Sequence, residues 1–233
     1  MIAHLVSHRL RRGFAALLGG GLVLGLTLGL ALASFAAARD TASAYGRVLE
    51  GADAETATVA HNMEPDEAAA ILDEQPAIAR HRYQGGYVAF VEGVDPALTG
   101  GVLAPAGDEF PLELPTLEAG RLPDPDRADE VFINEVLADA GGFQVGQDLT
   151  VRLELPGSDD AVLRSVTITG IGIFPREAVA DETALTGIVI GTRAFYEQNE
   201  HYQIYSNSRV WLDEPRDFPD LARTLSAEGM FIS

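Results

Sequence analysis

The sequence predicts an α+β protein in which one N-terminal transmembrane helix precedes a mixed, mostly antiparallel extracytoplasmic domain. Three observations support this prediction. An uncharged segment lies near the N-terminus, every acidic residue follows it, and strand-like and helix-like apolar periods then succeed one another without a strict βαβ rhythm. The predicted divisions are a basic cytoplasmic start at residues 1–13, the transmembrane helix at residues 14–38 and the extracytoplasmic domain at residues 39–233.

The uncharged segment is long enough to cross a membrane. Its 25 residues reach roughly 37 Å at about 1.5 Å per residue, against a hydrocarbon core of about 30 Å. Arg9, Arg11 and Arg12 precede it, so the positive-inside rule places the N-terminus in the cytoplasm. A cleaved signal peptide is the alternative, with Ala-x-Ala patterns at residues 31–33 and 36–38. The apolar region of a signal peptide is usually about 7–15 residues long, which favours an uncleaved anchor.

Glycines repeat at every fourth position within this segment, at Gly21, Gly25 and Gly29. Residues at this spacing lie on one face of a helix, and small residues there let a second helix approach closely. Glycine is also simply frequent in membrane helices, which is the alternative interpretation. The repeat predicts a helix that packs on other membrane helices through these three residues.

The first elements of the outer domain are a strand and a helix. Small apolar and polar residues alternate over residues 54–60, which predicts a strand. Pro65 and the acidic residues beside it suit the first turn of a helix, whose apolar stripe includes Ile71 and Leu72. Pro76 ends that helix.

The next stretch contains a β-type run and a long segment without clear periodicity. Residues 78–91 have strand character, and Gly85 and Gly86 within them predict a hairpin or a bulge. Residues 93–129 are rich in Gly, Pro and Asp. We expect them to form a loop with short strands around residues 110–117.

The clearest hairpin follows a strand–helix unit. Residues 130–140 combine a short strand with a helix that Asn134 caps and a glycine pair ends. Apolar and polar side chains alternate over residues 147–155 and again over residues 161–174. The turn at residues 156–160 joins these two strands.

The C-terminal part is predicted to alternate short strands with helices. The strands are at residues 188–190, 209–212 and 230–232. Thr192 caps a helix that extends to about residue 199. An amphipathic helix covers residues 217–228, and a glycine ends it.

Composition and missing motifs exclude several functions. The formal net charge is −19, and the 13 arginines and 35 acidic residues beyond the uncharged segment give the outer domain a charge of −22. We therefore expect no nucleic-acid partner, because phosphate binding needs a basic surface. Cysteine and lysine are absent, and no common catalytic motif occurs. His61, His81 and His201 lie far apart, so we expect surface histidines, no enzyme, no metal and no cofactor.

One acidic cluster could suit calcium, which prefers oxygen ligands. It consists of Asp124, Asp126, Asp129 and Glu130. The Arg-Ala pair at residues 127–128 interrupts the spacing of an EF-hand loop. A solvated loop is therefore the favoured interpretation, with calcium as the alternative.

Four short motifs follow the membrane segment in a characteristic order. They are residues 120–123 (GRLP), 129–135 (DEVFINE), 145–151 (VGQDLTV) and 166–172 (VTITGIG). Together with the basic start, the membrane segment and residues 38–45 (ARDTASAY), they resemble FtsX-like ABC transporter permeases with a MacB-like periplasmic core domain. Gln147 before Asp148 departs from the family's usual Gly-Asp pair.

The resemblance implies a role in transport across the cell membrane. The first membrane helix and the extracytoplasmic domain would couple a partner ATPase to the export or extraction of an amphiphilic substrate. The implied partners are a cytoplasmic ABC ATPase subunit, other permease membrane helices or a second permease copy, and the lipid bilayer. Because family permeases have further membrane helices, we expect this chain to be an N-terminal portion. The alternative is a stand-alone membrane-anchored binding or sensor module.

Overall fold

The computed structural model describes residues 33–35, 38–39, 55–110, 113–175, 177, 186–214 and 217–232. The chain divides into two compact units, residues 1–50 and residues 51–233. The described residues of the first unit are helical, but most of the predicted membrane segment lies outside the described part. Within the described part, no helix combines the length and apolar character that crossing a membrane requires.

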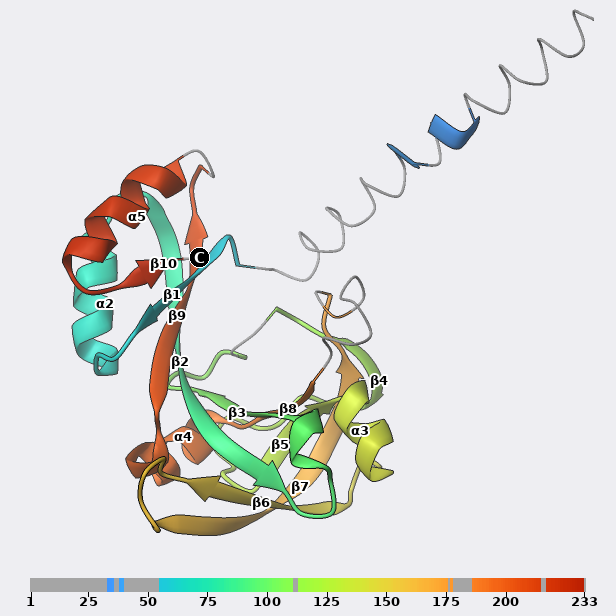
Figure 1. Ribbon diagram of the computed structural model, residues 1–233. Helices are drawn as coiled ribbons and strands as arrows, with labels where there is room; N and C mark the ends of the chain where they lie inside the picture. The colour runs from blue at the N-terminus through green and yellow to red at the C-terminus, as the bar shows by residue number, and fades with distance from the viewer. Residues whose placement is uncertain are drawn as a thin grey trace, which may run out of the picture. The chain divides into compact units, whose positions relative to one another are not determined.

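The second unit contains ten strands and four α-helices among its described residues (Figure 1). The strands are β1 (Ala57–His61), β2 (Ile78–Val91), β3 (Thr99–Pro105), β4 (Thr116–Gly120), β5 (Glu130–Asn134), β6 (Asp148–Glu154), β7 (Ala161–Ile173), β8 (Gly187–Ile190), β9 (Tyr205–Leu212) and β10 (Phe231–Ile232). The helices are α2 (Pro65–Asp73), α3 (Glu135–Gly141), α4 (Arg193–Asn199) and α5 (Phe218–Ala227), with short 3₁₀ turns η1 (Pro96–Leu98) and η4 (Glu200–Tyr202).

The strands form one mostly antiparallel sheet in the order β10-β1-β9-β2-β3-β8-β5-β7-β4, and β6 pairs with β2 and β7. Two of its pairs, β3–β8 and β5–β7, are parallel. This arrangement confirms the predicted mixture of helices with a mostly antiparallel sheet.

Two large apolar cores stabilise the sheet, and a third, smaller cluster contains Phe132, Phe174 and Ile190. One packs α2 and α5 against β1, β9 and β10, with Leu72 and Leu225 fully buried. Both helices lie together on the outer side of these strands in Figure 1. The other core packs α3 and α4 against β3, β5, β6, β7, β8 and the second half of β2. Tyr83 of β2 contacts both cores.

The predicted interruption of residues 78–91 is wrong, because β2 runs through its glycine pair as one 14-residue strand. The glycines instead make room for aromatic rings. A Cβ atom on Gly86 would lie 2.0 Å from the ring of Tyr205, and one on Gly85 would lie 2.9 Å from the ring of Tyr196. The irregular register with β9 occurs earlier, between Ile78 and Arg80.

The long loop predicted for residues 93–129 is also partly wrong. It contains β3, which pairs with β2 on one side and β8 on the other. Its apolar run is three residues long and follows two glycines, so it has no alternation that local sequence reasoning could detect. The predicted strand around residues 110–117 corresponds to β4, which begins later and ends at Gly120.

Most of the other predicted elements are present. The hairpin of β6 and β7 pairs Leu149 with Val166 and Leu153 with Val162. The predicted caps of α3 and α4 accept hydrogen bonds from backbone amides, at 3.2 Å for Asn134 and 3.0 Å for Thr192. In α3 the buried residues are Leu137 and Ala138, and Ala140 is exposed.

Candidate functional site

The predicted membrane-packing residues, Gly21, Gly25 and Gly29, lie outside the described residues, so that prediction remains open. The outer-domain motifs lie within the described part. We therefore consider what these motifs build together and which polar side chains they place near one another.

The four motifs converge on the C-terminal half of β7, although they are far apart in the sequence. The amide of Gly146 donates to the carbonyl of Ile168 at 2.7 Å, and the hydroxyl of Thr167 donates to Asp148 at 2.9 Å. Strand β5 pairs with β7 in parallel, and β4 pairs with it antiparallel. At the end of β4, the amide of Arg121 donates to the carbonyl of Thr169 at 2.9 Å. The four motifs thus pack together and form one continuous part of the fold.

Gly120 and Gly146 have the positive φ values expected of their turns, +78° and +86°. Gly120 also lies against the backbone, since an added Cβ atom would be 2.1 Å from the carbonyl oxygen of Thr169. A side chain at this position would therefore be both strained and sterically blocked.

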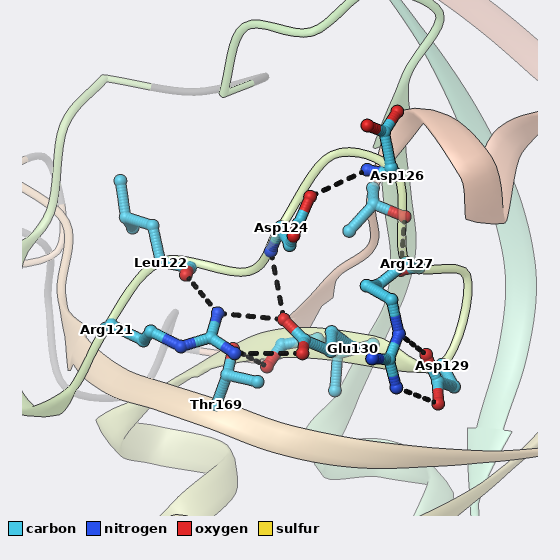
Figure 2. A network of polar contacts seen from close by, with 10 residues as sticks. Arg121, Leu122, Asp124, Asp126, Arg127, Asp129, Glu130 and Thr169 are labelled. Atoms are coloured by element: carbon cyan, nitrogen blue, oxygen red, sulfur yellow. Dashed lines mark hydrogen bonds and ion pairs between the residues drawn. The ribbon is translucent and has the colours of Figure 1, made fainter.

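An ion pair joins the two ends of the segment between β4 and β5 (Figure 2). Arg121 donates two hydrogen bonds to the carboxylate of Glu130, each 2.8 Å long. The same carboxylate accepts from the amide of Asp124 at 3.0 Å, and Arg121 also donates to the carbonyl of Leu122. Glu130 is 8% exposed. The Arg121 hydrogen bonds lower the pKa of Glu130, so the carboxylate stays charged although it is buried.

Two other acids of the predicted cluster also contact arginines, whereas the carboxylate of Asp124 accepts from the amide of Asp126 at 3.1 Å. Asp129 accepts two hydrogen bonds from Arg127, at 2.9 and 2.8 Å. Asp126 forms an ion pair with Arg193 of α4. Among the described residues, no group of three or more His, Asp or Glu side chains is arranged to hold a metal ion. Arginines thus pair with three of the four carboxylates, Asp126, Asp129 and Glu130, and Glu130 is buried rather than solvated.

The same segment is tied to the start of α4. The hydroxyl of Thr192 donates to the carbonyl of Arg127 at 2.9 Å, and the amide of Ala194 donates to the carbonyl of Pro125 at 3.0 Å. A cavity of about 90 Å³ lies between this segment, residues 105–110 and the beginning of α4. Phe110 lines it and packs edge-on against the buried Phe132, with ring centroids 5.7 Å apart.

Asn134 does more than the predicted capping. Its side-chain oxygen accepts from the amides of Leu137 in α3 and Ile188 in β8, at 3.2 and 2.9 Å. Its amide group donates to Glu177 at 2.5 Å and to the carbonyl of Thr186 at 2.8 Å. The side chain is fully buried. One residue of the DEVFINE motif therefore joins a strand, a helix and a distant strand, which its sequence neighbours alone could not indicate.

His61 is buried rather than a surface residue, which corrects the sequence-based expectation. It is 5% exposed, and its ring contacts Ser206 and Ser208 of β9. His81 and His201 instead contact exposed carboxylates, Asp73 and Asp160 respectively, each at 3.0 Å. The alternation of β1 would have indicated the burial of His61, because Ala57 and Val59 share its face.

Comparison with known proteins gives structural likenesses but no match in sequence. No protein-family model matches the chain, and no curated protein matches it in sequence. The chain is similar to the crystal structure of the extracellular domain of a noncanonic ABC-type transporter, YknZ, from Gram-positive bacteria. The TM-score is 0.45 at 10% identity, and the match covers 76% of this chain and 98% of that chain. A likeness of this size does not by itself establish a shared fold.

Proposed function

We propose that this chain is part of an ABC transporter permease subunit of the FtsX-like class, with residues 39–233 as a MacB-like extracytoplasmic domain. In this proposal, the first membrane helix and the domain transmit motion between a partner ATPase in the cytoplasm and an amphiphilic substrate outside. The chain itself catalyses no reaction, and ATP hydrolysis belongs to the partner.

The observation that carries the proposal is where the domain begins and ends. Its first strand, β1, and the last described strand, β10, are antiparallel neighbours, with Val59 opposite Ile232. Ile232 therefore lies beside the point where the chain enters the sheet. A domain with adjacent ends can be inserted between two membrane segments on one side of a bilayer.

Two further features support the same function. The segment of residues 14–38 is uncharged and follows three arginines, so the positive-inside rule directs everything after it outward. The four motifs that resemble the permease family converge on β7 and form one packed unit. Their side chains hold the fold together, which agrees with a domain that moves as a body rather than one that performs chemistry.

The alternative is a stand-alone membrane-anchored binding or sensor module. Both functions place the domain outside the cell. They differ in whether an ATPase and other permease helices assemble with this chain.

The location can be tested with single cysteines, because the chain has none of its own. Ser158 lies in the exposed turn between β6 and β7, and Ser7 lies in the basic start. Ser158→Cys should react with a membrane-impermeant maleimide on intact cells. Ser7→Cys should react only after lysis. The reverse pattern would contradict the proposed orientation.

The class can be tested by purifying the full chain from its native membranes in mild detergent. We expect a cytoplasmic ATPase with a P-loop sequence to co-purify in a stoichiometric ratio. A chain that purifies without any such ATPase, after mild crosslinking as well as before it, would favour the sensor module.

A further inference from the structure

His61 occupies the end of β1, where the chain turns toward α2. Its Nε2 atom lies 2.9 Å from the hydroxyl oxygen of Ser208, which is fully buried, and its Nδ1 atom lies 3.2 Å from that of Ser206. Both serines belong to β9. The ring therefore joins the turn after β1 to the neighbouring strand.

The surrounding hydrogen bonds determine which ring nitrogen carries the proton. The amide of Met63 points at Nδ1 from 3.4 Å, and an amide can only donate. The hydroxyl of Ser206 lies 3.2 Å from Nδ1 and 2.9 Å from the carbonyl of His61, so it can donate its one hydrogen to either. The Met63 amide therefore makes Nδ1 the acceptor, and Nε2 carries the hydrogen and donates it to Ser208.

The hydrogen-bond network continues from Met63 to further residues. Its carbonyl accepts from the hydroxyl of Tyr83 at 3.0 Å, and Gln203 donates to that hydroxyl at 2.9 Å. Met63 and Ser206 also line two neighbouring cavities of about 340 and 220 Å³. A change in the hydrogen bonds of the His61 ring would therefore affect the turn that contains Met63, and Met63 lines both cavities.

We propose that His61 is an acid-sensitive latch, which holds the turn between β1 and α2 on β9 when neutral and releases Met63 when protonated. An imidazolium donates from both nitrogens, so its Nδ1–H would face the amide hydrogen of Met63. Two donors cannot bond each other, and the Met63 amide loses its partner. The latch follows from these contacts and does not depend on the proposed transport function.

The surroundings of the His61 ring shift its protonation from near-neutral pH to acidic pH. Burial lowers the pKa of His61 from about 6.5 to about 4. Among the described residues, the hydrogen-bond partners of the ring are two serines and one amide, none of them charged. The ring of Tyr83 lies 5.5 Å away, centroid to centroid. The charged groups of the packed elements face the adjoining cavities: Glu64 and Glu200 in one, and Asp66, His81, Arg82 and Glu109 in another that Ser208 also lines.

The methionines of the chain offer a direct readout. The three are Met1, Met63 and Met230, and Met230 is fully buried in the core beneath α5. In the full chain labelled with ¹³C-methyl methionine, the Met63 resonance should move between pH 7.5 and 3.5 with a midpoint near 4, while Met230 stays in place. A stationary Met63, a midpoint near 6.5, or movement of Met230 together with Met63 would overturn the latch.

Because carboxylates also titrate near pH 4, variants must separate their effect. His61→Gln should abolish the Met63 shift, and His81→Gln should leave it unchanged. The same shift in His61→Gln would overturn the proposal. If His61→Gln does not fold, ¹⁵N spectra of the imidazoles in the unsubstituted chain decide, with His61 assigned by elimination in single Gln variants of the other four histidines, His4, His8, His81 and His201. A neutral ring protonated on Nδ1 at pH 7.5 would contradict the proposal, and one protonated on Nε2 would support it.

Discussion

At the scale of single residues, the carboxylate of Glu130 is the group in the four motifs that depends most on its hydrogen-bond partners. It is nearly buried, yet it stays charged because it accepts two hydrogen bonds from Arg121 and one from the backbone. A buried charge is stable only when its partners are in place. The neighbouring pair of Arg127 and Asp129 has similar geometry, but both side chains are more than half exposed. Water therefore screens that pair, and it should contribute little.

Glu130→Gln should destabilise the protein by about 2 kcal/mol, because the new amide group would point hydrogens at the guanidinium. Asp129→Asn is the matched control and should change the free energy of unfolding by about 0.5 kcal/mol or less. Urea unfolding of both variants at pH 7 measures the difference. Equal effects would show that burial does not distinguish the two pairs.

The Glu130 contribution should also depend on pH in a defined direction. Its pKa is lowered in the folded protein, so the folded state binds this proton less tightly than the unfolded state does. The stabilisation is complete above the ordinary glutamate pKa of about 4.5 and is lost as the pH falls through the lowered value. The stability gap between the unsubstituted chain and Glu130→Gln should therefore close on acidification, and a gap that widens would have the wrong sign.

Gly170 tests how closely the motif strands pack. An added Cβ atom would lie 2.3 Å from the carbonyl oxygen of Arg121, which the pairing of β4 and β7 holds in place. Gly170→Ala should cost about 1–3 kcal/mol. Gly107→Ala, at an exposed position where an added Cβ meets nothing within 4 Å, should be neutral to slightly stabilising. Thermal unfolding that ranks the two variants the other way would contradict this packing.

At the scale of elements, the hairpin of β6 and β7 carries much of the larger core. Leu149, Val151 and Leu153 are fully or almost fully buried, and they pack with residues of α3 and α4. The opposite face of the same hairpin is open, and Leu163 there is 56% exposed.

Leu153→Asp should cost at least about 3 kcal/mol, because it places an unpaired carboxylate in an apolar core. Leu163→Asp makes the same chemical change on the open face and should stay within about 0.5 kcal/mol. The melting temperatures of the two variants provide the comparison. An unchanged melting temperature for Leu153→Asp would mean that the hairpin faces the other way.

Sequence reasoning succeeded where local signals fix an element. Asn134 and Thr192 capped their helices as expected, and the alternation of β6 predicted which of its side chains are buried, whereas residues 168–172 of β7 are all buried. It failed where distant partners decide. The short apolar run of β3 becomes a strand because β2 and β8 flank it, and the glycine pair in β2 is explained by rings from other elements. The ion pair of Arg121 with Glu130 could have been suspected from opposite charges at the ends of one loop, but its burial could not.

At the scale of the whole molecule, one sheet joins two cores. The long strand β2 pairs with β9 along its first part and with β3 and β6 along its second part, so it passes from one core to the other. The adjacent positions of β1 and β10 place the entrance and the exit of the chain at one edge. Such a domain can follow the movement of the segments to which it is attached, which is what the proposed transport role requires.

The central claim is that this chain works as part of a membrane complex that an ATPase drives. Lipid offers no hydrophobic drive for helices to associate, so close contact at Gly25, in the middle of the glycine repeat, should be needed for assembly. The decisive measurement is the ATP hydrolysis rate of the complex purified with its ATPase. Gly25→Leu should lower that rate severalfold, whereas Leu24→Ile, one position away, should leave it unchanged. If the two variants behave alike, the glycines have no packing role. If no ATPase purifies with the chain at all, the account of this chain as a permease part is contradicted in favour of a single-anchor sensor.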